Sequence, residues 1–101
     1  GPAELPAYTA AKAAIIGLTK TTARKYGPDR IRANAIVPGW VVTDRQKSLW
    51  LTPQAEQEWK EMCCLKEDLL PQDVARLALF LASDDARMIT NQAFVIDGGR
   101  L

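Results

Sequence analysis

Apolar residues recur at helical spacing through the first quarter of the chain. Four of them follow the i, i+3, i+4, i+7 rule of one helix face: Ala11, Ala14, Ile15 and Leu18. We expect this alanine-rich helix to begin near Tyr8 and to end near Tyr26. Gly27-Pro28 follows directly and is a stop signal, because glycine can turn left-handed and proline cannot continue the helix.

Two short apolar runs predict strands. Residues 31–37 read IRANAIV without strict alternation, which is typical of a parallel-sheet strand covered on both faces. Asn34 is the polar exception and needs hydrogen-bond partners if it is buried. The Pro-Gly pair at 38–39 ends this strand. Residues 93–96 form the second run, which the turn-forming Asp-Gly-Gly at 97–99 closes.

Two further helices are predicted between the strands. Thr52 is a good N-cap and Pro53 suits the first helical position, so we expect a helix from Pro53 to near Cys63. Residues 71–83 predict another helix, with Asp73 near the positive end of its dipole. Its apolar stripe consists of Val74, Leu77, Ala78 and Leu81.

The order of elements is therefore helix, strand, helical insertion, helix, strand. A strand, a crossover helix and a second strand form a βαβ unit with parallel strands. Two strands alone leave an open edge on each side, and no strand precedes the first helix. We therefore expect an α/β fold that is one end of a larger doubly wound sheet. Residues 1–101 would be part of a single domain, with residues 40–70 as an insertion that serves as a lid or binding loop.

The composition of the chain excludes several kinds of function. The chain has 101 residues, 13 Lys and Arg against 12 Asp and Glu, and no histidine. A net charge of +1 gives no electrostatic case for nucleic acid or an acidic membrane surface. No apolar run reaches the length that a membrane span needs. Without histidine, imidazole-based catalysis is excluded.

The two cysteines, Cys63 and Cys64, are adjacent. Neighbouring residues cannot close a loop by a disulfide, and two thiols without histidine do not make a zinc site. We interpret them as reduced thiols on a helix, which suits the cytoplasm. No metal site is predicted.

Tyr8 and Lys12 are four residues apart, so a helix places them on one face. The pKa of tyrosine is ordinarily about 10, and a neighbouring ammonium lowers that pKa because it favours the phenolate. Such a pair can exchange a proton with a substrate hydroxyl or carbonyl. Taken alone, the spacing favours a simpler interpretation, a packed ring beside a solvated lysine.

Longer stretches of the chain resemble the short-chain dehydrogenase/reductase family. Four elements stand in the family's order: Tyr8-x-x-x-Lys12 opening an alanine-rich helix, the strand IRANAIVPG, Thr43 four residues after Gly39, and VIDGG near the C-terminus. The helix PQDVARLALFLASDDA is also similar to the family's penultimate core helix. The resemblance spans essentially all 101 residues, and the combination of motifs is highly specific.

The resemblance implies the C-terminal part of a Rossmann-type fold and an oxidoreductase activity. A hydride would pass between the nicotinamide of NAD or NADP and an alcohol or carbonyl carbon of a small molecule. Tyr8 would be the general acid/base, and Lys12 would bind the nicotinamide ribose and lower the tyrosine pKa.

The resemblance also implies cofactor contacts after the first strand. Pro38 and Gly39 would let the backbone approach the nicotinamide, and Val41 would offer backbone groups to its carboxamide. Thr43 would offer its hydroxyl to the carboxamide or a phosphate; the alternative is an ordinary turn residue.

Several family parts do not occur in this sequence, and the family's order places them before Gly1. They include the glycine-rich phosphate turn, the residue that selects NAD or NADP, and the catalytic serine. We therefore expect the 101 residues alone to have negligible activity. Two residues depart from the family pattern: Asn91 replaces a common glycine, and Arg100 replaces a common aromatic residue. Asparagine tolerates a left-handed backbone, so we expect the turn at Asn91 to survive.

The string PGWVVTDRQKSLWLTP is similar to the family members that act on sugars, the aldose dehydrogenases. Aromatic faces and hydrogen-bond donors that suit a polyhydroxylated ligand come from Trp40, Arg45, Gln46 and Trp50. The alternative is that Trp50 and Trp59 only anchor the lid helices to the core.

A second hypothesis is a non-catalytic fragment that assembles with copies of itself or with the missing N-terminal half. Family members usually form dimers or tetramers through this first helix and the last helix–strand unit. The small residues Ala10, Ala13, Ala14 and Gly17 would permit such packing. An intact small binding module that merely shares the motifs is a third interpretation. It leaves Tyr8 and Lys12 without a reason to accompany Val41 and Thr43.

Overall fold

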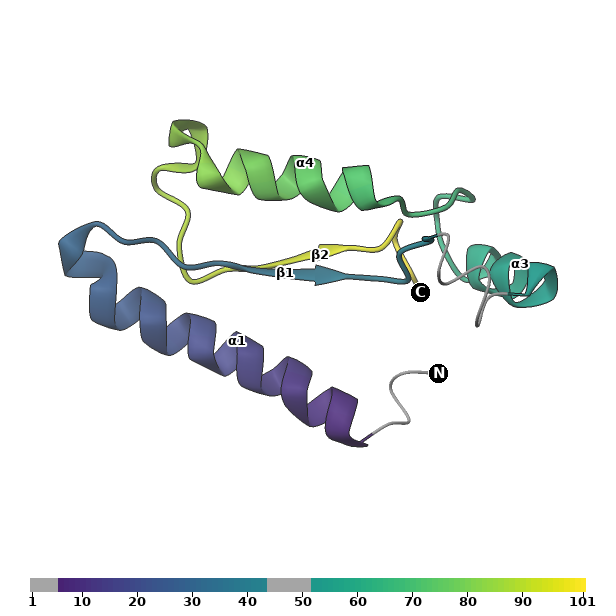
Figure 1. The fold of residues 1–101 in the computed structure, drawn as a ribbon, viewed down its shortest axis with the longest axis horizontal. Coiled ribbons are helices and arrows are strands. Elements are labelled where there is room, and N and C mark those ends of the chain that lie inside the picture. Colours follow the sequence, from purple (N-terminus) through teal and green to yellow (C-terminus); the bar gives the residue numbers. More distant parts are fainter. Residues whose placement is uncertain (1–5, 44–51) are drawn as a thin grey trace. The chain divides into compact units, whose positions relative to one another are not determined.

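The computed structural model describes residues 6–43 and 52–101, without the side chain of Tyr8. Its elements follow the predicted order of helix, strand, helix, helix, strand (Figure 1). The regular elements are α1 (Pro6–Tyr26), β1 (Ala35–Pro38), α3 (Pro53–Glu61), α4 (Pro71–Ala82) and β2 (Ala93–Ile96). Two short 3₁₀ turns, η2 (Gly27–Asp29) and η3 (Asp84–Ala86), follow α1 and α4.

The chain forms two compact units. One comprises Gly1–Ala35 with Leu81–Phe94, and the other comprises Ile36–Phe80 with Val95–Leu101. The division falls within β1 and β2, which pair as a two-stranded sheet.

The two strands of this sheet are parallel, as predicted. In the first unit the Ala35 N–H donates to the Gln92 carbonyl at 2.9 Å, and in the second the Gly39 N–H donates to the Ile96 carbonyl at 2.9 Å. Donor and acceptor both advance by four residues, which is the register of a parallel pair.

The first helix ends at Tyr26, where the sequence predicts its end, but by a different cap. Gly27 does not have a positive φ and instead opens the 3₁₀ turn. The left-handed residue is Arg30, with φ of 63°. Its N–H donates to the Gly27 carbonyl at 2.9 Å, and the Ile31 N–H donates to the Tyr26 carbonyl at 3.1 Å. These bonds satisfy carbonyls that the helix end leaves without partners.

The first strand is shorter than the predicted 31–37, because side chains replace ladder bonds at its start. Asn34 Nδ2 donates to the Ile89 carbonyl at 2.9 Å, and Asn34 Oδ1 accepts from the Gln92 N–H at 3.2 Å. The Ala33 N–H donates to Thr90 Oγ1 at 3.1 Å. The half-buried Asn34 therefore has the partners that the sequence requires, and side-chain bonding of this kind competes with a regular ladder.

Helix α3 begins on the predicted Thr52 cap, and α4 begins with a hydrogen bond to Asp73, the residue predicted near the positive end of its dipole. The Ala55 N–H donates to Thr52 Oγ1 at 3.1 Å before α3. The Leu70 N–H donates to Asp73 Oδ2 at 2.8 Å before α4. Helix α3 ends at Glu61, so the prediction that the cysteines lie on a helix is wrong. They lie after the helix, in a segment whose backbone pairs with residues 98–100.

The turn after β2 is held by its aspartate. Asp97 Oδ1 accepts hydrogen bonds from the Gly99 N–H at 2.8 Å and the Arg100 N–H at 3.2 Å. Gly98 and Gly99 have φ of 74° and 79°, a backbone conformation that favours glycine. Their carbonyls accept from the N–H groups of Leu65 and Cys64, so this turn anchors the segment that follows α3.

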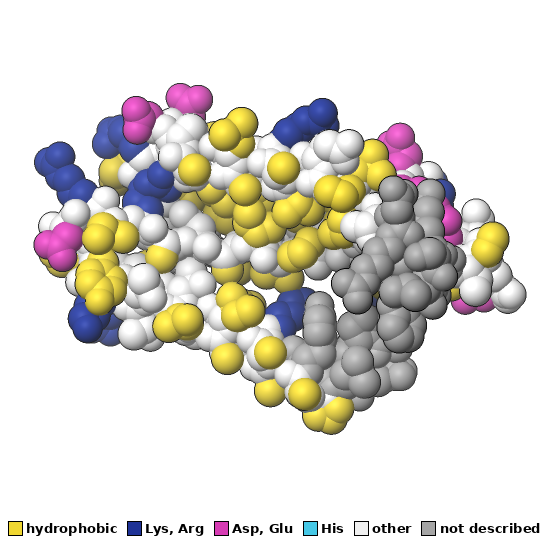
Figure 2. Space-filling model, viewed as in Figure 1, with side chains coloured by type: hydrophobic (Ala, Val, Ile, Leu, Met, Phe, Trp, Pro, Cys, Tyr) yellow, Lys and Arg dark blue, Asp and Glu magenta, His cyan; other side chains and the backbone are white. Residues whose placement is uncertain are grey.

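Few residues are fully buried in the described part of the chain. The buried apolar side chains are Ala23, Ala35, Cys63, Leu81 and Ala86. The predicted apolar face of the first helix is exposed, with Ile15 58% and Leu18 66% accessible. In β2, Val95 is 66% accessible, and Ile36 and Val37 of β1 are half-buried. The strands are therefore only partly covered by the described residues, and hydrophobic side chains lie at the surface in Figure 2.

Asn91 provides a test of backbone strain in the first unit. Its φ of 58° confirms the expected left-handed turn, and its N–H donates to the Ala33 carbonyl at 2.8 Å. We expect Asn91→Ala to lower the free energy of unfolding by about 1 kcal/mol, because a Cβ without a local hydrogen-bonding group strains this conformation. Asn91→Gly removes the same side chain without the strain and should not destabilise the protein. Urea unfolding of both variants checks this; equal losses of stability would refute it.

Candidate functional site

Tyr8 and Lys12 lie in the first two turns of α1, in the first unit. They are four positions apart in an α-helix, so the backbone places both positions on one face. The side chain of Lys12 is exposed, so its ammonium is open to a ligand. The position of the Tyr8 phenol lies outside what the structure describes.

The predicted cofactor residues after β1 lie in the second unit. Gly39 is tightly enclosed: a Cβ at this position would lie 2.6 Å from Cβ of Asp97 and 3.6 Å from Cζ2 of Trp59. The lack of a side chain at Gly39 is therefore required by contacts within the chain itself. Pro38, the last residue of β1, is exposed.

Val41 and Thr43 follow in a segment that pairs with the approach to α4. Val41 forms an isolated parallel bridge with Leu69, and the Val42 N–H donates to the Leu69 carbonyl at 2.8 Å. In this register Leu69 bonds to the neighbours of Val41, so the N–H and carbonyl of Val41 itself point toward the opposite edge. Thr43 is half-buried.

Trp40 packs against a tryptophan nineteen positions along the chain. The rings of Trp40 and Trp59 are edge-to-face, with centroids 5.4 Å apart and an interplanar angle of 89°. The Arg100 guanidinium lies over the Trp59 ring, 4.8 Å from its centroid. Trp59 thus links α3 to Trp40 and to Arg100.

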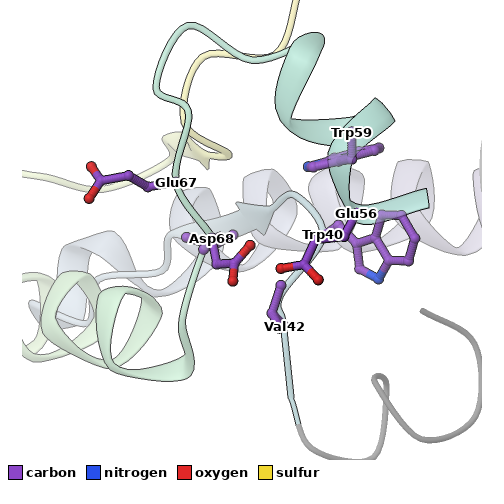
Figure 3. A pocket seen from close by; sticks show the side chains of 7 residues that line it. Trp40, Val42, Glu56, Trp59, Glu67 and Asp68 are labelled. Carbon is purple, nitrogen blue, oxygen red and sulfur yellow. The ribbon is translucent and has the colours of Figure 1, made fainter. Parts of the chain in front are cut away.

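A small hollow that is open to solvent lies beside the two tryptophans. Seven residues line it: Trp40, Val42, Glu56, Trp59, Glu67, Asp68 and Leu69. The carboxylates of Glu56 and Asp68 lie near each other, whereas that of Glu67 points away (Figure 3). Lys60 explains the close approach of the first two, because its Nζ lies 3.4 Å from Glu56 Oε1 and 3.1 Å from Asp68 Oδ1.

These ion pairs raise the pKa of Lys60 above its ordinary value. The hydrogen bond and charge of Asp68 are the main cause, and Glu56 adds to the effect, while partial desolvation opposes it. Lys60 thereby joins α3 to the segment that carries Leu69.

The cysteines are unpaired and differ in environment. Cys63 is buried, and its thiol donates to the Asp97 carbonyl at 3.6 Å, whereas Cys64 is exposed. Within residues 6–43 and 52–101, no group of His, Cys, Asp or Glu side chains is arranged to hold a metal ion. Across the same ranges, no helix combines the length and apolar character that crossing a bilayer demands.

The structure brings only part of the predicted site together. Pro38, Gly39, Trp40, Val41 and Thr43 form one continuous strip in the second unit, whereas Tyr8 and Lys12 belong to the first unit. Arg45, Gln46 and Trp50 lie outside the described residues.

Sequence reasoning did not identify the residues that surround Trp40. Arg100 contacts Trp59 from forty-one positions along the chain, and Lys60 pairs with Asp68 at a separation of eight, so local spacing reveals neither contact. Only the i, i+4 spacing of Glu56 and Lys60 was a readable signal.

Comparison with known proteins identifies the family. Residues 2–100 match the family described as Enoyl-(Acyl carrier protein) reductase. The chain is 54% identical over 96 residues to a probable galactose dehydrogenase of Rhizobium meliloti, covering 95% of this chain and 38% of the relative. It is 46% identical over 99 residues to a D-xylose 1-dehydrogenase of Caulobacter vibrioides, covering 98% and 40% respectively.

A solved structure supports the same assignment. A 4-hydroxyisoleucine dehydrogenase complexed with NADH matches with a TM-score of 0.85 and 41% identity, over 92% of this chain and 38% of that one. The chain belongs to the short-chain dehydrogenase/reductase family and carries part of its Rossmann-type fold. It spans about two-fifths of the length of the curated relatives named above.

The tight enclosure of Gly39 predicts that an alanine substitution changes the free energy of unfolding in opposite directions at Gly39 and at Gly17. Gly39→Ala should lower the free energy of unfolding by about 1–3 kcal/mol, because its Cβ overlaps Asp97. Gly17→Ala is the matched control: nothing lies within 4 Å of its Cβ position in α1, so it should stabilise by about 0.5–1 kcal/mol. Urea unfolding measures both, and a neutral Gly39→Ala would contradict the contact.

The Lys60 ion pairs predict a pH dependence at high pH. Because folding raises the pKa of Lys60, the pairs stabilise fully below the unfolded pKa of about 10.4. Their contribution is lost as pH rises through the folded pKa. The difference in Tm between wild type and Lys60→Met should therefore shrink above about pH 10. Lys20→Met, on the exposed surface of α1, is the control; a difference that stays constant would exclude these pairs as its source.

Proposed function

We propose that this chain supplies the proton-transfer residues and part of the nicotinamide site of an NAD(P)-dependent sugar dehydrogenase. The observation that carries the proposal is the Tyr8-x-x-x-Lys12 pair on the first turns of α1 in a chain of this family. The hydride passes between the cofactor and an alcohol or carbonyl carbon of the substrate, and the cofactor supplies or accepts it.

The residues of this chain move the proton. In reduction, the Tyr8 hydroxyl donates its proton to the substrate oxygen, and in oxidation its phenolate accepts the proton from the substrate hydroxyl. The ammonium of Lys12 stabilises the phenolate. The exposed ammonium also has three N–H donors, which suit ribose hydroxyls.

The donor set after β1 fits a nicotinamide. A carboxamide offers one acceptor and two donors, and the N–H and carbonyl of Val41 point away from Leu69 as a complementary pair. Thr43 adds a hydroxyl two residues further on. Pro38 is exposed and carries no long side chain, so the chain is approachable at this residue, whereas the Cβ side of Gly39 is filled by Asp97. Nothing described in this set selects between NAD and NADP.

A sugar substrate is supported by the relatives and by Trp40. Two relatives at 54% and 46% identity carry the names of sugar dehydrogenases. The half-buried indole of Trp40 can pack on the apolar face of a pyranose, and Arg45, Gln46 and Trp50 supply further donors and an aromatic face. The unpaired cysteines favour a reducing compartment, the cytoplasm.

Assembly without catalysis is a second candidate role for the chain by itself. Large apolar side chains are exposed in both units, including Ile15, Leu18, Val95 and Leu79, the last 73% accessible. Such surface favours association with copies of this chain or with the remaining part of a family domain. Light scattering and native mass spectrometry distinguish the two: a soluble monomer with a cooperative melt contradicts assembly.

A hybrid enzyme tests the catalytic proposal. In the Rhizobium meliloti relative, the matched 96-residue stretch is exchanged for the corresponding stretch of this chain. The hybrid should oxidise an aldose with NAD or NADP, whereas the isolated 101 residues should show negligible turnover. Tyr8→Phe should lower kcat by about 10²–10⁴-fold, since the general acid/base is lost.

Tyr26→Phe is the matched control, because it removes a tyrosine hydroxyl at the other end of α1. A folded hybrid that turns over steroids or acyl ketones but no aldose would refute the sugar assignment. Full activity of Tyr8→Phe would refute the role of Tyr8.

A further inference from the structure

We propose that Arg100 is a positioning residue that holds the Trp59–Trp40 pair and thereby shapes the substrate side of the strip that follows β1. Its guanidinium lies over Trp59, 4.8 Å from the ring centroid, and its Nη2 lies 3.9 Å from Sδ of Met62. No carboxylate among the described residues forms an ion pair with it. The guanidinium therefore packs on α3 and the residue after it.

The backbone brings Arg100 to this place independently of its side chain. Arg100 and Cys63 form an antiparallel bridge, and the Leu101 N–H donates to the Met62 carbonyl at 2.9 Å. The Arg100 N–H is also bound by the side chain of Asp97. Substitution of Arg100 thus leaves the main-chain contacts in place and tests the guanidinium alone.

Trp59 contacts residues of the proposed site. Trp59 touches the space beside Gly39 and meets Trp40 edge-to-face at 5.4 Å. Trp40 is followed directly by Val41, which the proposed function assigns to the carboxamide. An indole of Trp59 that is free to tilt changes where the Trp40 ring lies, and the substrate meets a less ordered surface.

The chemistry of the guanidinium explains why arginine can hold the Trp59 ring. A planar guanidinium stacks on an indole as an aromatic ring does, whereas the compact, strongly hydrated ammonium of lysine does not stack in this way. Arg100 thus supplies by stacking the contact that an aromatic residue would make at the same position. The inference rests on the proposed function only for its effect on the substrate; the Trp59–Trp40 geometry is testable without it.

The first experiment is spectroscopic. Coupled indoles produce an exciton couplet in far-ultraviolet circular dichroism, which Trp40→Phe identifies by difference in the 101-residue chain and in the hybrid enzyme. Arg100→Met should reduce this couplet, Arg100→Tyr should retain it, and Arg100→Lys should resemble Arg100→Met. Arg87→Met, with the same loss of charge at an exposed position, is the control and should retain it.

The second experiment is kinetic and uses the hybrid. Arg100→Met should raise KM for the aldose about two- to fivefold, the factor that an exposed cation–π contact provides. The value of kcat should stay the same, because the proton-transfer pair is untouched, and Arg100→Tyr should restore KM.

An unchanged couplet in Arg100→Met, or an equal loss in Arg87→Met, overturns the proposal. A changed couplet with an unchanged KM overturns its link to the substrate. A hybrid without dehydrogenase activity overturns the proposed function instead, and the couplet then still decides whether Arg100 positions the two tryptophans.

Discussion

The close approach of Gly39 to Asp97 is the constraint on which the second unit depends. A Cβ on Gly39 would lie 2.6 Å from that of Asp97, so the strip after β1 and the turn after β2 meet only because position 39 has no side chain. Asp97 in turn holds the turn through Gly99 and Arg100. That turn pairs with the segment after α3, which brings Trp59 beside Trp40. One missing side chain thus permits the whole arrangement around Trp40.

In the first unit, hydrogen bonds from polar side chains hold distant segments of the chain together. Asn34 uses both ends of its amide on backbone groups more than fifty residues away. Arg32 adds bonds to the carbonyls of Ile89 and Ser83 at 3.2 and 3.4 Å. These bonds take the place of ladder pairs, so β1 begins only at Ala35. The buried apolar side chains described in this unit are three alanines and one leucine: Ala23, Ala35, Ala86 and Leu81.

Local rules predicted most of the elements. The stop after Tyr26, the Thr52 cap, the limits of β2 and the left-handed Asn91 follow from the intrinsic preferences of those residues. The errors lie where a distant partner overrides such a preference. Cys63 leaves the helix because it pairs with Arg100, and Arg30 turns left-handed where glycine was expected to do so. For the site, the motif residues were identifiable, but their surroundings were not.

The sequence by itself determined the order of elements, the parallel pairing and the family, because periodicity, caps and short motifs act over a few residues. Only the tertiary structure decided the reason for glycine at position 39 and the neighbours of Trp40. It also decided the partner of Arg100 and the ion pair with Asp68 that is the main cause of the raised pKa of Lys60. Those features join residues separated by up to fifty-eight positions, as for Gly39 and Asp97. Their energies depend on distance and burial in space, which no spacing along the chain encodes.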